Sequence, residues 1–310
     1  MSLVPTDTAM TAALCRETIL ALTREYPRIR SREIARTDYG REVTALEIGE
    51  GSRRVLYAAA FHGNEWITAS VLLEFARELA QAAQEGQLLA GADARQLLEQ
   101  VTVCLVPMVN PDGVDLVTGA AGPETAEYEA ARRLAANYPD IPFPAGWKAN
   151  LRGVDLNLQF PAGWLLAREI KFSQGYTRPG PRDYVGRAPL TQPEARALAE
   201  LTEDLQPRAV LAYHSQGRVI YWQFRGAAPA GAEQLGRELA EVSGYALEET
   251  PYDSSFAGFK DWFIQEEDRP GYTVEVGEGE NPLPIGQFDT IYRENLGILI
   301  RTAQWAAEQT

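Results

Sequence analysis

The stretch that decides the fold reads Val55-Leu56-Tyr57-Ala58-Ala59-Ala60-Phe61-His62-Gly63-Asn64-Glu65-Trp66. Seven apolar residues precede a polar turn, and one apolar stripe then follows at helical spacing, formed by Ile67, Val71, Leu72, Phe75 and Leu79. This pattern predicts a strand over residues 55–61 and a helix over residues 65–84. His62 would therefore lie where the strand ends and the helix begins.

Strands and helices alternate along the rest of the chain. We predict helices over Ala12–Tyr26, Thr191–Leu205 and Phe288–Glu308, and further strands over Val43–Ile48, Val101–Val109, Ala209–His214 and Tyr272–Val276. Residues 191–194 fit a capping box with an early proline. The alternation indicates a single α/β domain with a mixed, mostly parallel central sheet and helices on both faces. Residues 138–189, rich in Pro, Gly and aromatics, are predicted to form the irregular walls of a cleft.

Composition limits the classes of function. Of the 310 residues, 45% are apolar, as in ordinary globular proteins, and we expect one catalytic domain over residues 1–310. The formal charge of −14, from 29 basic and 43 acidic residues, argues against a nucleic acid or an anionic membrane as partner. No membrane span or signal peptide is visible, so a cytoplasmic location is expected. The sequence does not reveal the oligomeric state.

The chain has only two histidines, His62 and His214, and both follow or end apolar runs. Such strand ends are where an open α/β sheet places its ligand crevice. Glu65 follows His62 by three residues, so that its carboxylate can turn toward the same ion. Two histidines and one glutamate form the three-ligand zinc set that keeps a fourth position for water, which is a catalytic arrangement. A closed structural zinc site does not fit, because Cys15 and Cys104 are the only cysteines.

Two further segments carry groups suited to hydrolysis. Glu275 lies inside an apolar strand, where a carboxylate without a partner is costly, so a catalytic or paired role is favoured. Asp155 and Asn157 would point to one side of an extended stretch, as alternate residues do. Each feature alone also fits a structural role: His214 a core histidine, and residues 150–157 a surface loop.

Taken together, the motifs resemble the zinc metallocarboxypeptidases of the carboxypeptidase A type. The resemblance runs from about Tyr39 to the final helix and rests on His62-x-x-Glu65, Asn110-Pro111-Asp112-Gly113, Arg152-Gly153-Val154-Asp155-Leu156-Asn157, His214-Ser215, Tyr252 and Glu275. Finer details resemble the bacterial branch that cleaves γ-D-glutamyl–diamino acid bonds in cell-wall peptides: His62-Gly63-Asn64-Glu65-Trp66, Trp147-Lys148-Ala149-Asn150, His214-Ser215-Gln216-Gly217 and Ser255-Phe256-Ala257-Gly258-Phe259-Lys260-Asp261-Trp262.

This resemblance implies one zinc ion per chain, bound by His62, Glu65 and His214. It also implies that Glu275 is the general base that activates water and shuttles its proton. Zinc would polarise the water and the peptide carbonyl. The expected activity is therefore that of a zinc metallopeptidase acting on a peptide.

Other site roles come from the same resemblance. Arg152 would face the developing oxyanion and bind substrate, and Asp155 would accept a hydrogen bond from His62 and fix its tautomer. Asn157 and Tyr252 would contact the substrate near the scissile bond. Residues 110–113 are also an ordinary turn sequence, and they are assigned only a scaffold role.

One departure from the digestive enzymes of this family bears on the substrate. Those enzymes carry an Arg after the residue that matches Asn157, and it grips the terminal carboxylate of the substrate; here the position is Leu158. An enzyme that cuts a γ-D-glutamyl–diaminopimelate bond in a cell-wall muropeptide fits better. Lys260, Arg182 and Arg218 are candidates for reading the charged groups of the diamino acid, and the sequence does not choose among them.

Two other functions remain open at this level. One is a zinc carboxypeptidase or an N-acyl amino acid deacylase with another substrate. The other is a non-catalytic binding protein that keeps the zinc site, although the presence of both Glu275 and Arg152 argues against it.

Overall fold

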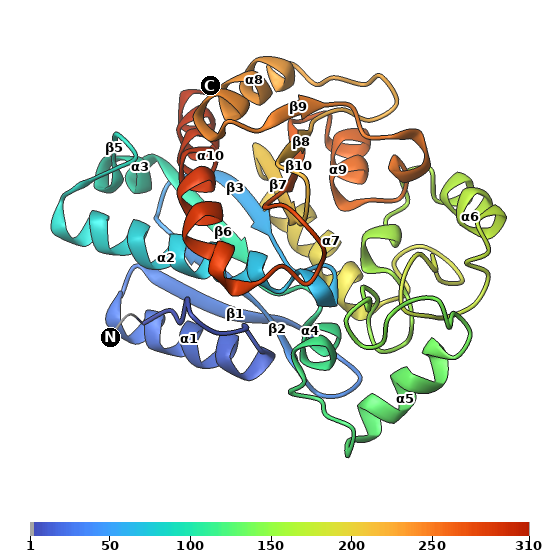
Figure 1. Ribbon diagram of the computed structural model, residues 1–310. Helices are drawn as coiled ribbons and strands as arrows, with labels where there is room; N and C mark the ends of the chain where they lie inside the picture. The colour runs from blue at the N-terminus through green and yellow to red at the C-terminus, as the bar shows by residue number, and fades with distance from the viewer. Residues whose placement is uncertain (1–2, 310) are drawn as a thin grey trace.

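One continuous sheet of eight strands runs through the protein, in the order β1-β2-β6-β3-β7-β10-β8-β9 (Figure 1). The computed structural model describes residues 3–309. The strands of this sheet are β1 (Ile29–Arg36), β2 (Glu42–Ile48), β3 (Arg53–Ala58), β6 (Val101–Val106), β7 (Ala209–His214), β8 (Val219–Tyr221), β9 (Ala246–Glu248) and β10 (Gly271–Glu275). The four middle strands β6, β3, β7 and β10 are parallel, whereas β2 and β8 pair antiparallel with β6 and β10. The predicted mixed, mostly parallel sheet is confirmed.

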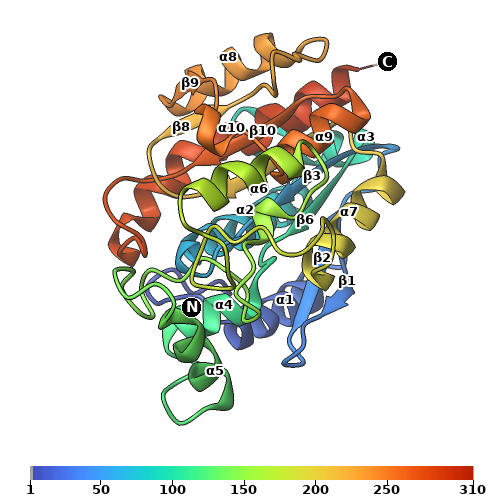
Figure 2. The ribbon, with the colours of Figure 1, turned by 90° about the vertical axis from the view of Figure 1, so that its right-hand side faces the viewer.

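Helices cover both faces of the sheet, as predicted (Figures 1 and 2). The helices of one face are α1 (Ala12–Glu25), α2 (Ile67–Glu85), α3 (Ala94–Gln100), α8 (Ala232–Ser243) and α10 (Phe288–Glu308); those of the other are α6 (Trp164–Ser173), α7 (Pro193–Leu205) and α9 (Phe259–Glu267). Between these layers lie two apolar cores. Val55 and Tyr57 of β3 face the first core, and Leu56 and Ala58 face the second, because successive strand residues point to opposite faces.

The remaining elements lie at the margins. They are the two-stranded hairpin of β4 (Leu88–Leu89) and β5 (Ala92–Asp93), the helices α4 (Pro111–Thr118) and α5 (Ala126–Ala135), and four short 3₁₀ turns, η1 (Gly63–Glu65), η2 (Leu156–Leu158), η3 (Tyr252–Ser254) and η4 (Ile285–Gln287). A small third core around Trp147 joins α4 and α5. Within residues 3–309, no helix has both the length and the apolar character needed to cross a bilayer.

Several predicted boundaries differ from the structure. β3 ends at Ala58 rather than at residue 61, because Ala60 adopts a positive φ of 49° that leaves the extended conformation. β6 likewise ends at Val106 rather than Val109. The residues that follow β3 and β6 still hydrogen-bond to each other beyond the regular strand pairing, since Val109 N donates to Ala59 O at 3.0 Å.

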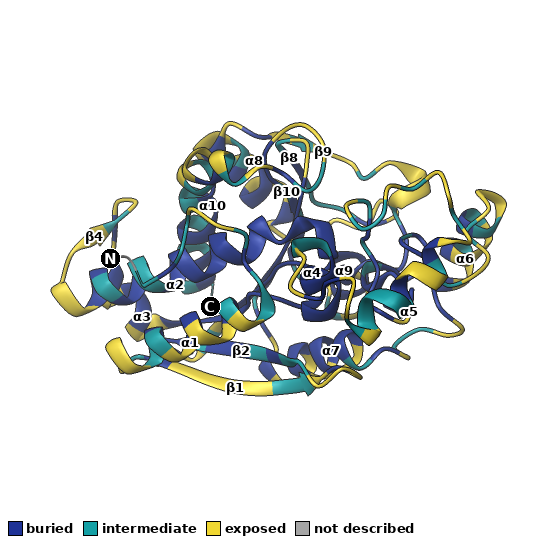
Figure 3. Cartoon of the chain, turned by 60° about the horizontal axis from the view of Figure 1, so that its bottom comes forward, coloured by how far each residue is buried: buried dark blue, intermediate teal, exposed yellow. Residues whose placement is uncertain are grey.

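Other differences concern a helix cap and elements that were not predicted. The expected capping box at residues 191–194 is absent: the N-cap is Gln192, without a side-chain cap, and Glu194 is instead buried beside Asn150. Helix α6 lies inside the segment predicted to be irregular. β1 escaped prediction because most of its side chains are exposed at the sheet edge (Figure 3), so that it carries little apolar signal.

The topology brings the expected site residues together. β3, β7 and β10 are adjacent and parallel, so their carboxyl ends meet at one edge of the sheet. His62 follows β3 after a short bend, His214 ends β7 and Glu275 ends β10. Glu275 and His214 are also direct register partners.

Gly63 permits the close turn that connects His62 to Glu65. A Cβ atom at this residue would lie 2.4 Å from the backbone oxygen of Gly113 in α4, a contact that the backbone cannot relieve without moving. The Gly63 N–H also donates to Lys148 O at 3.0 Å. The turn is therefore fixed between two other segments of the site.

We predict that Gly63→Ala lowers the free energy of unfolding by about 1–3 kcal/mol, the usual cost of overpacking. The added methyl must push the turn away from α4, so metal binding should weaken as well. Denaturant unfolding and metal titration measure both effects. Gly286→Ala is the matched control, because nothing lies within 4 Å of its added Cβ; equal behaviour of the two variants would contradict the prediction.

Candidate active site

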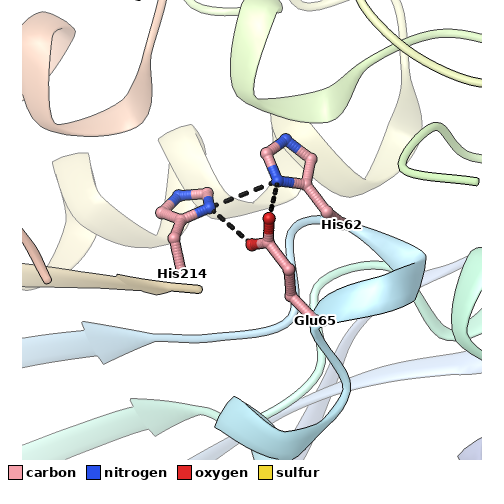
Figure 4. A group of neighbouring side chains, drawn as sticks. All are labelled: His62, Glu65 and His214. Carbon is pink, nitrogen blue, oxygen red and sulfur yellow. Dashed lines mark hydrogen bonds and ion pairs between the residues drawn. The ribbon is translucent and has the colours of Figure 1, made fainter. Parts of the chain in front are cut away.

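Three side chains converge at the carboxyl edge of the sheet (Figure 4). Glu65 Oε1 lies 2.9 Å from His62 Nδ1, Glu65 Oε2 lies 2.9 Å from His214 Nδ1, and the two Nδ1 atoms are 3.3 Å apart. All three side chains are buried, and their ligand atoms lie within 4.8 Å of one another. Two imidazole nitrogens and one carboxylate, arranged in this way, could hold a metal ion and match the donor set of a catalytic zinc site.

The rings are oriented by their surroundings. His62 Nε2 lies 3.0 Å from Asp155 Oδ1, and a proton shared there leaves the Nδ1 lone pair directed at Glu65 and His214. Asp155 is itself fixed, because Oδ1 accepts from Asn157 N and Oδ2 accepts from Asp183 N. The ring of His214 stacks on Phe61, with 5.0 Å between centroids. Asp155 thus makes the contact with His62 that the family resemblance implied.

The electrostatics of this group favour a positive charge. Burial alone would lower the pKa of His62, but the carboxylates of Glu65 and Asp155 outweigh it and raise the pKa to about 9. Burial alone would raise the pKa of Glu65, but His62 and Lys148 hold it well below its usual range. Burial lowers the pKa of His214. The site therefore stabilises a cation between these groups, which a metal ion supplies as well as a proton does.

Glu275 is half-buried and lines the same pocket. Among residues 3–309 its carboxylate has no hydrogen-bond or ion-pair partner. Burial, together with the charge of Glu65, raises the pKa of Glu275 to about 8. A metal cation beside it would counteract both effects and favour the ionised form. The arrangement provides a free carboxylate next to the group that can hold the metal.

The structure does not bring Arg152 to this site. Its guanidinium forms an ion pair with Asp38, with Nη2 2.6 Å from Oδ1, and half of its side chain is exposed away from the pocket. The reason is local: Asn150 Oδ1 accepts from the Arg152 and Val154 backbone N–H groups, and Gly153 turns the chain with a φ of 71°. The expected position of Arg152 opposite the oxyanion is thereby corrected.

Lys148 is the cation that contacts the candidate metal ligands. Its Nζ lies 2.9 Å from Glu65 Oε1, and its side chain lines the pocket. Burial alone would lower the pKa of Lys148, but Glu65 outweighs it and the pKa is raised, so the amine is charged. Lys148 was not predicted from the sequence to be a site residue, although the Trp147-Lys148-Ala149-Asn150 motif contains it.

The expected substrate contacts divide between two hollows. Asn157 and Leu158 line the pocket with His62 and His214, and Asn157 Oδ1 accepts from Phe259 N at 3.0 Å. Tyr252 is 64% exposed and lines a neighbouring hollow, which shares Thr250 with the first. Tyr252 packs edge-on against Phe256, so the structure places it beside the pocket rather than inside it.

Only two of the three cations expected to bind charged groups of the substrate lie in the pocket. Lys260 and Arg182 line the pocket, whereas Arg218 lies elsewhere, 2.9 Å from Glu294 and above the ring of Tyr245. Arg218 is therefore no longer a candidate for binding the substrate in this pocket.

Comparisons with known proteins agree with this geometry. Residues 16–297 match the family model described as zinc carboxypeptidase. The chain is 45% identical over 282 residues to γ-D-glutamyl-L-diamino acid endopeptidase 1 of Lysinibacillus sphaericus, covering 91% of this chain and 69% of that protein. It is 40% identical over 278 residues to the uncharacterized protein YqgT of Bacillus subtilis (strain 168), covering 89% and 72%.

A solved structure shares the fold. Bovine thrombin-activatable fibrinolysis inhibitor, in complex with tick carboxypeptidase inhibitor, superposes with a TM-score of 0.75 at 16% identity over 98% of this chain and 99% of its own. The residues matched by the family model include His62, Glu65, His214 and Glu275. The chain belongs to the zinc carboxypeptidase family and is a metallopeptidase.

Proposed function

We propose that this protein hydrolyses the bond between γ-D-glutamate and a diamino acid, diaminopimelate, in cell-wall peptides. The observation that supports the proposal is the lining of the pocket: His62, His214 and Glu275 line it together with Leu158, which cannot bind a carboxylate, and with the cations Lys148, Lys171, Arg182 and Lys260. The named activity of the Lysinibacillus sphaericus relative supports this substrate. A cytoplasmic location, the single-domain extent of residues 1–310 and the muropeptide as partner stay predictions.

One zinc ion per chain is proposed at His62, Glu65 and His214. The donor set fits, because two neutral imidazoles and one carboxylate leave a divalent ion with a net positive charge. Zinc held there would supply Lewis acidity, which makes water a stronger acid and a peptide carbonyl a better electrophile. Asp155 contributes by orienting His62.

The residues of the chain then divide the remaining chemistry. Glu275 takes a proton from water as the water oxygen bonds to the scissile carbonyl carbon, and passes it to the departing amine as the C–N bond breaks. Lys148, charged and beside Glu65, supplies the positive group that faces the developing oxyanion, the role first expected of Arg152. Asn157 is placed to donate a hydrogen bond to substrate within the pocket, and Tyr252 to contact it from the neighbouring hollow.

We predict that His214→Ala loses most of its bound zinc, because it removes one of three protein ligands. Metal analysis of the purified protein measures the zinc content. Tyr213→Phe is the matched control: it alters the adjacent residue of β7, whose buried hydroxyl has no hydrogen-bond partner among the described residues, and it should keep a full equivalent. A full equivalent of zinc in His214→Ala would refute the ligand assignment.

We predict that Lys148→Met lowers kcat/KM by about 100-fold or more, as loss of an oxyanion-stabilising group does. Arg152→Gln should stay within about threefold of the parent, since an exposed ion pair contributes little. Lys148→Arg keeps the charge and should recover part of the activity. Kinetics on zinc-loaded proteins give the comparison; a large loss in Arg152→Gln with little loss in Lys148→Met would reverse the assignment.

The proposed substrate is tested by comparing a γ-D-glutamyl–meso-diaminopimelate peptide with ordinary peptides and N-acyl amino acids. We expect release of the diaminopimelate-containing fragment, detected by mass spectrometry, and much slower release of ordinary C-terminal residues. Glu275→Gln should keep its zinc and lose nearly all turnover, because the amide cannot accept the proton. Preferential cleavage of ordinary peptides or N-acyl amino acids would favour the carboxypeptidase or deacylase alternative instead.

A further inference from the structure

Four basic side chains line the pocket, and the three lysines among them each form an ion pair with a carboxylate of the protein. The Nζ atoms of Lys148, Lys171 and Lys260 lie 2.9, 2.7 and 2.6 Å from the carboxylates of Glu65, Asp183 and Asp261. Lys260 Nζ additionally donates to Gln223 O at 2.7 Å and to Thr250 Oγ1 at 3.3 Å. The positive charge of each lysine is thus balanced by a carboxylate of the protein.

Arg182 differs from the other three. Its one hydrogen bond within residues 3–309 runs from Nε to Asp183 Oδ2 at 2.6 Å, and neither Nη group donates a hydrogen bond to those residues. Its side chain is 40% exposed and lines the pocket. Both Nη groups of the guanidinium therefore remain free to donate to a ligand in the pocket.

Backbone contacts on both sides hold Arg182 in place. Pro181 O accepts from the N–H groups of Lys148 and Ala149, at 2.7 and 2.8 Å. Asp183 N donates to Asp155 Oδ2 at 3.2 Å, and Asp183 adopts a positive φ of 64°. Arg182 is therefore tied to the segment of Lys148 and to the residue that orients His62. Such anchoring reduces the entropy that the side chain loses when it binds a ligand.

A purely structural role does not account for this cation. Lys171 already pairs with Asp183 at 2.7 Å and balances its charge, so Arg182 is a surplus positive charge in the Lys171–Asp183–Arg182 group. A free guanidinium edge presents parallel N–H donors that match a carboxylate. The chemistry of the vacant edge is that of a carboxylate-binding site.

We propose that Arg182 is a substrate-binding residue that clamps a carboxylate of the substrate. The inference rests on the proposed function, and it supplies the anion recognition that Leu158 cannot. Two substrate carboxylates have the required chemistry. One is the α-carboxylate of the γ-linked D-glutamyl residue, which stays free because the peptide bond uses the side chain. The other belongs to the diamino acid.

The test compares the binding affinities of three ligands for proteins with and without Arg182→Gln, and it does not depend on turnover. Calorimetry in the Glu275→Gln background measures binding of the γ-D-glutamyl–meso-diaminopimelate dipeptide and of two analogues, one with the glutamyl α-carboxylate and one with the diaminopimelate carboxylates converted to carboxamides. Adding Arg182→Gln should weaken binding of the parent dipeptide by about 10- to 100-fold, as expected for a charge-assisted contact. The analogue that lacks the clamped carboxylate should bind weakly and equally to both proteins, which identifies the carboxylate.

Two further variants control this comparison. Arg187→Gln alters an exposed arginine of the same loop that lies outside the pocket, and it should leave all three affinities unchanged. Arg182→Lys keeps the charge without the planar fork and should recover part of the affinity, which excludes loss of folding as the cause. Zinc content and thermal unfolding are compared for every protein.

Equal weakening of all three ligands by Arg182→Gln, unchanged affinity, or no binding of the dipeptide in the Glu275→Gln background would each overturn the clamp. Failure of the protein with Glu275 intact to cleave the dipeptide would instead overturn the proposed function. The two results are separable, because the affinity comparison scores recognition and the cleavage assay scores chemistry.

Discussion

Glu65 carries a carboxylate that is only 1% exposed, and the geometry of the site depends on its two oxygens. Oε1 contacts His62 Nδ1 and Lys148 Nζ, both at 2.9 Å, and Oε2 contacts His214 Nδ1 at 2.9 Å. A buried carboxylate is tolerated only when it is paired and hydrogen-bonded. The cost of burying Glu65 is thus offset by partners from the turn after β3, from β7 and from the loop of Lys148. Because this loop has no regular structure, the interaction with Glu65 also fixes part of the pocket wall.

The sheet makes this convergence possible. Parallel strands end at the same edge, and β7 lies between β3 and β10, so that His214 is flanked by the ends of both neighbours. The strands are buried on both faces by separate apolar cores, which leaves their ends little freedom to move. His62, His214 and Glu275 are consequently positioned by the ends of buried strands rather than by mobile surface loops. Arg182, which we propose to read the substrate, lies in one of the long loops, as binding residues commonly do.

The sequence could predict the parts of the site that depend on strand ends. An apolar run followed by His62, another ending at His214, and a third containing Glu275 predict three strand ends, and the parallel sheet then brings them together. It could not predict which cation enters the pocket. Lys148 and Arg152 are four residues apart in an irregular loop, and their directions depend on the Asn150 hydrogen bonds and the turn at Gly153. Such contacts have no periodic signature. Helix α6 was missed for a similar reason, since its short apolar face includes only a few buried residues.

The chain as a whole is strongly acidic, whereas its pocket contains four basic side chains. A formal charge of −14 would repel a substrate that carries several carboxylates, yet surface charges act over only about 8 Å at physiological salt. Inside the pocket, Asp183 and Asp261 are paired with lysines, which removes their repulsion without removing the positive charge of Arg182. A carboxylate that enters therefore meets a free guanidinium and neutral pairs rather than a row of acids. Asp183 and Asp261 thus hold the lysines in place without leaving an unpaired negative charge, and the unpaired Nη groups of Arg182 are what the proposed anion recognition would use.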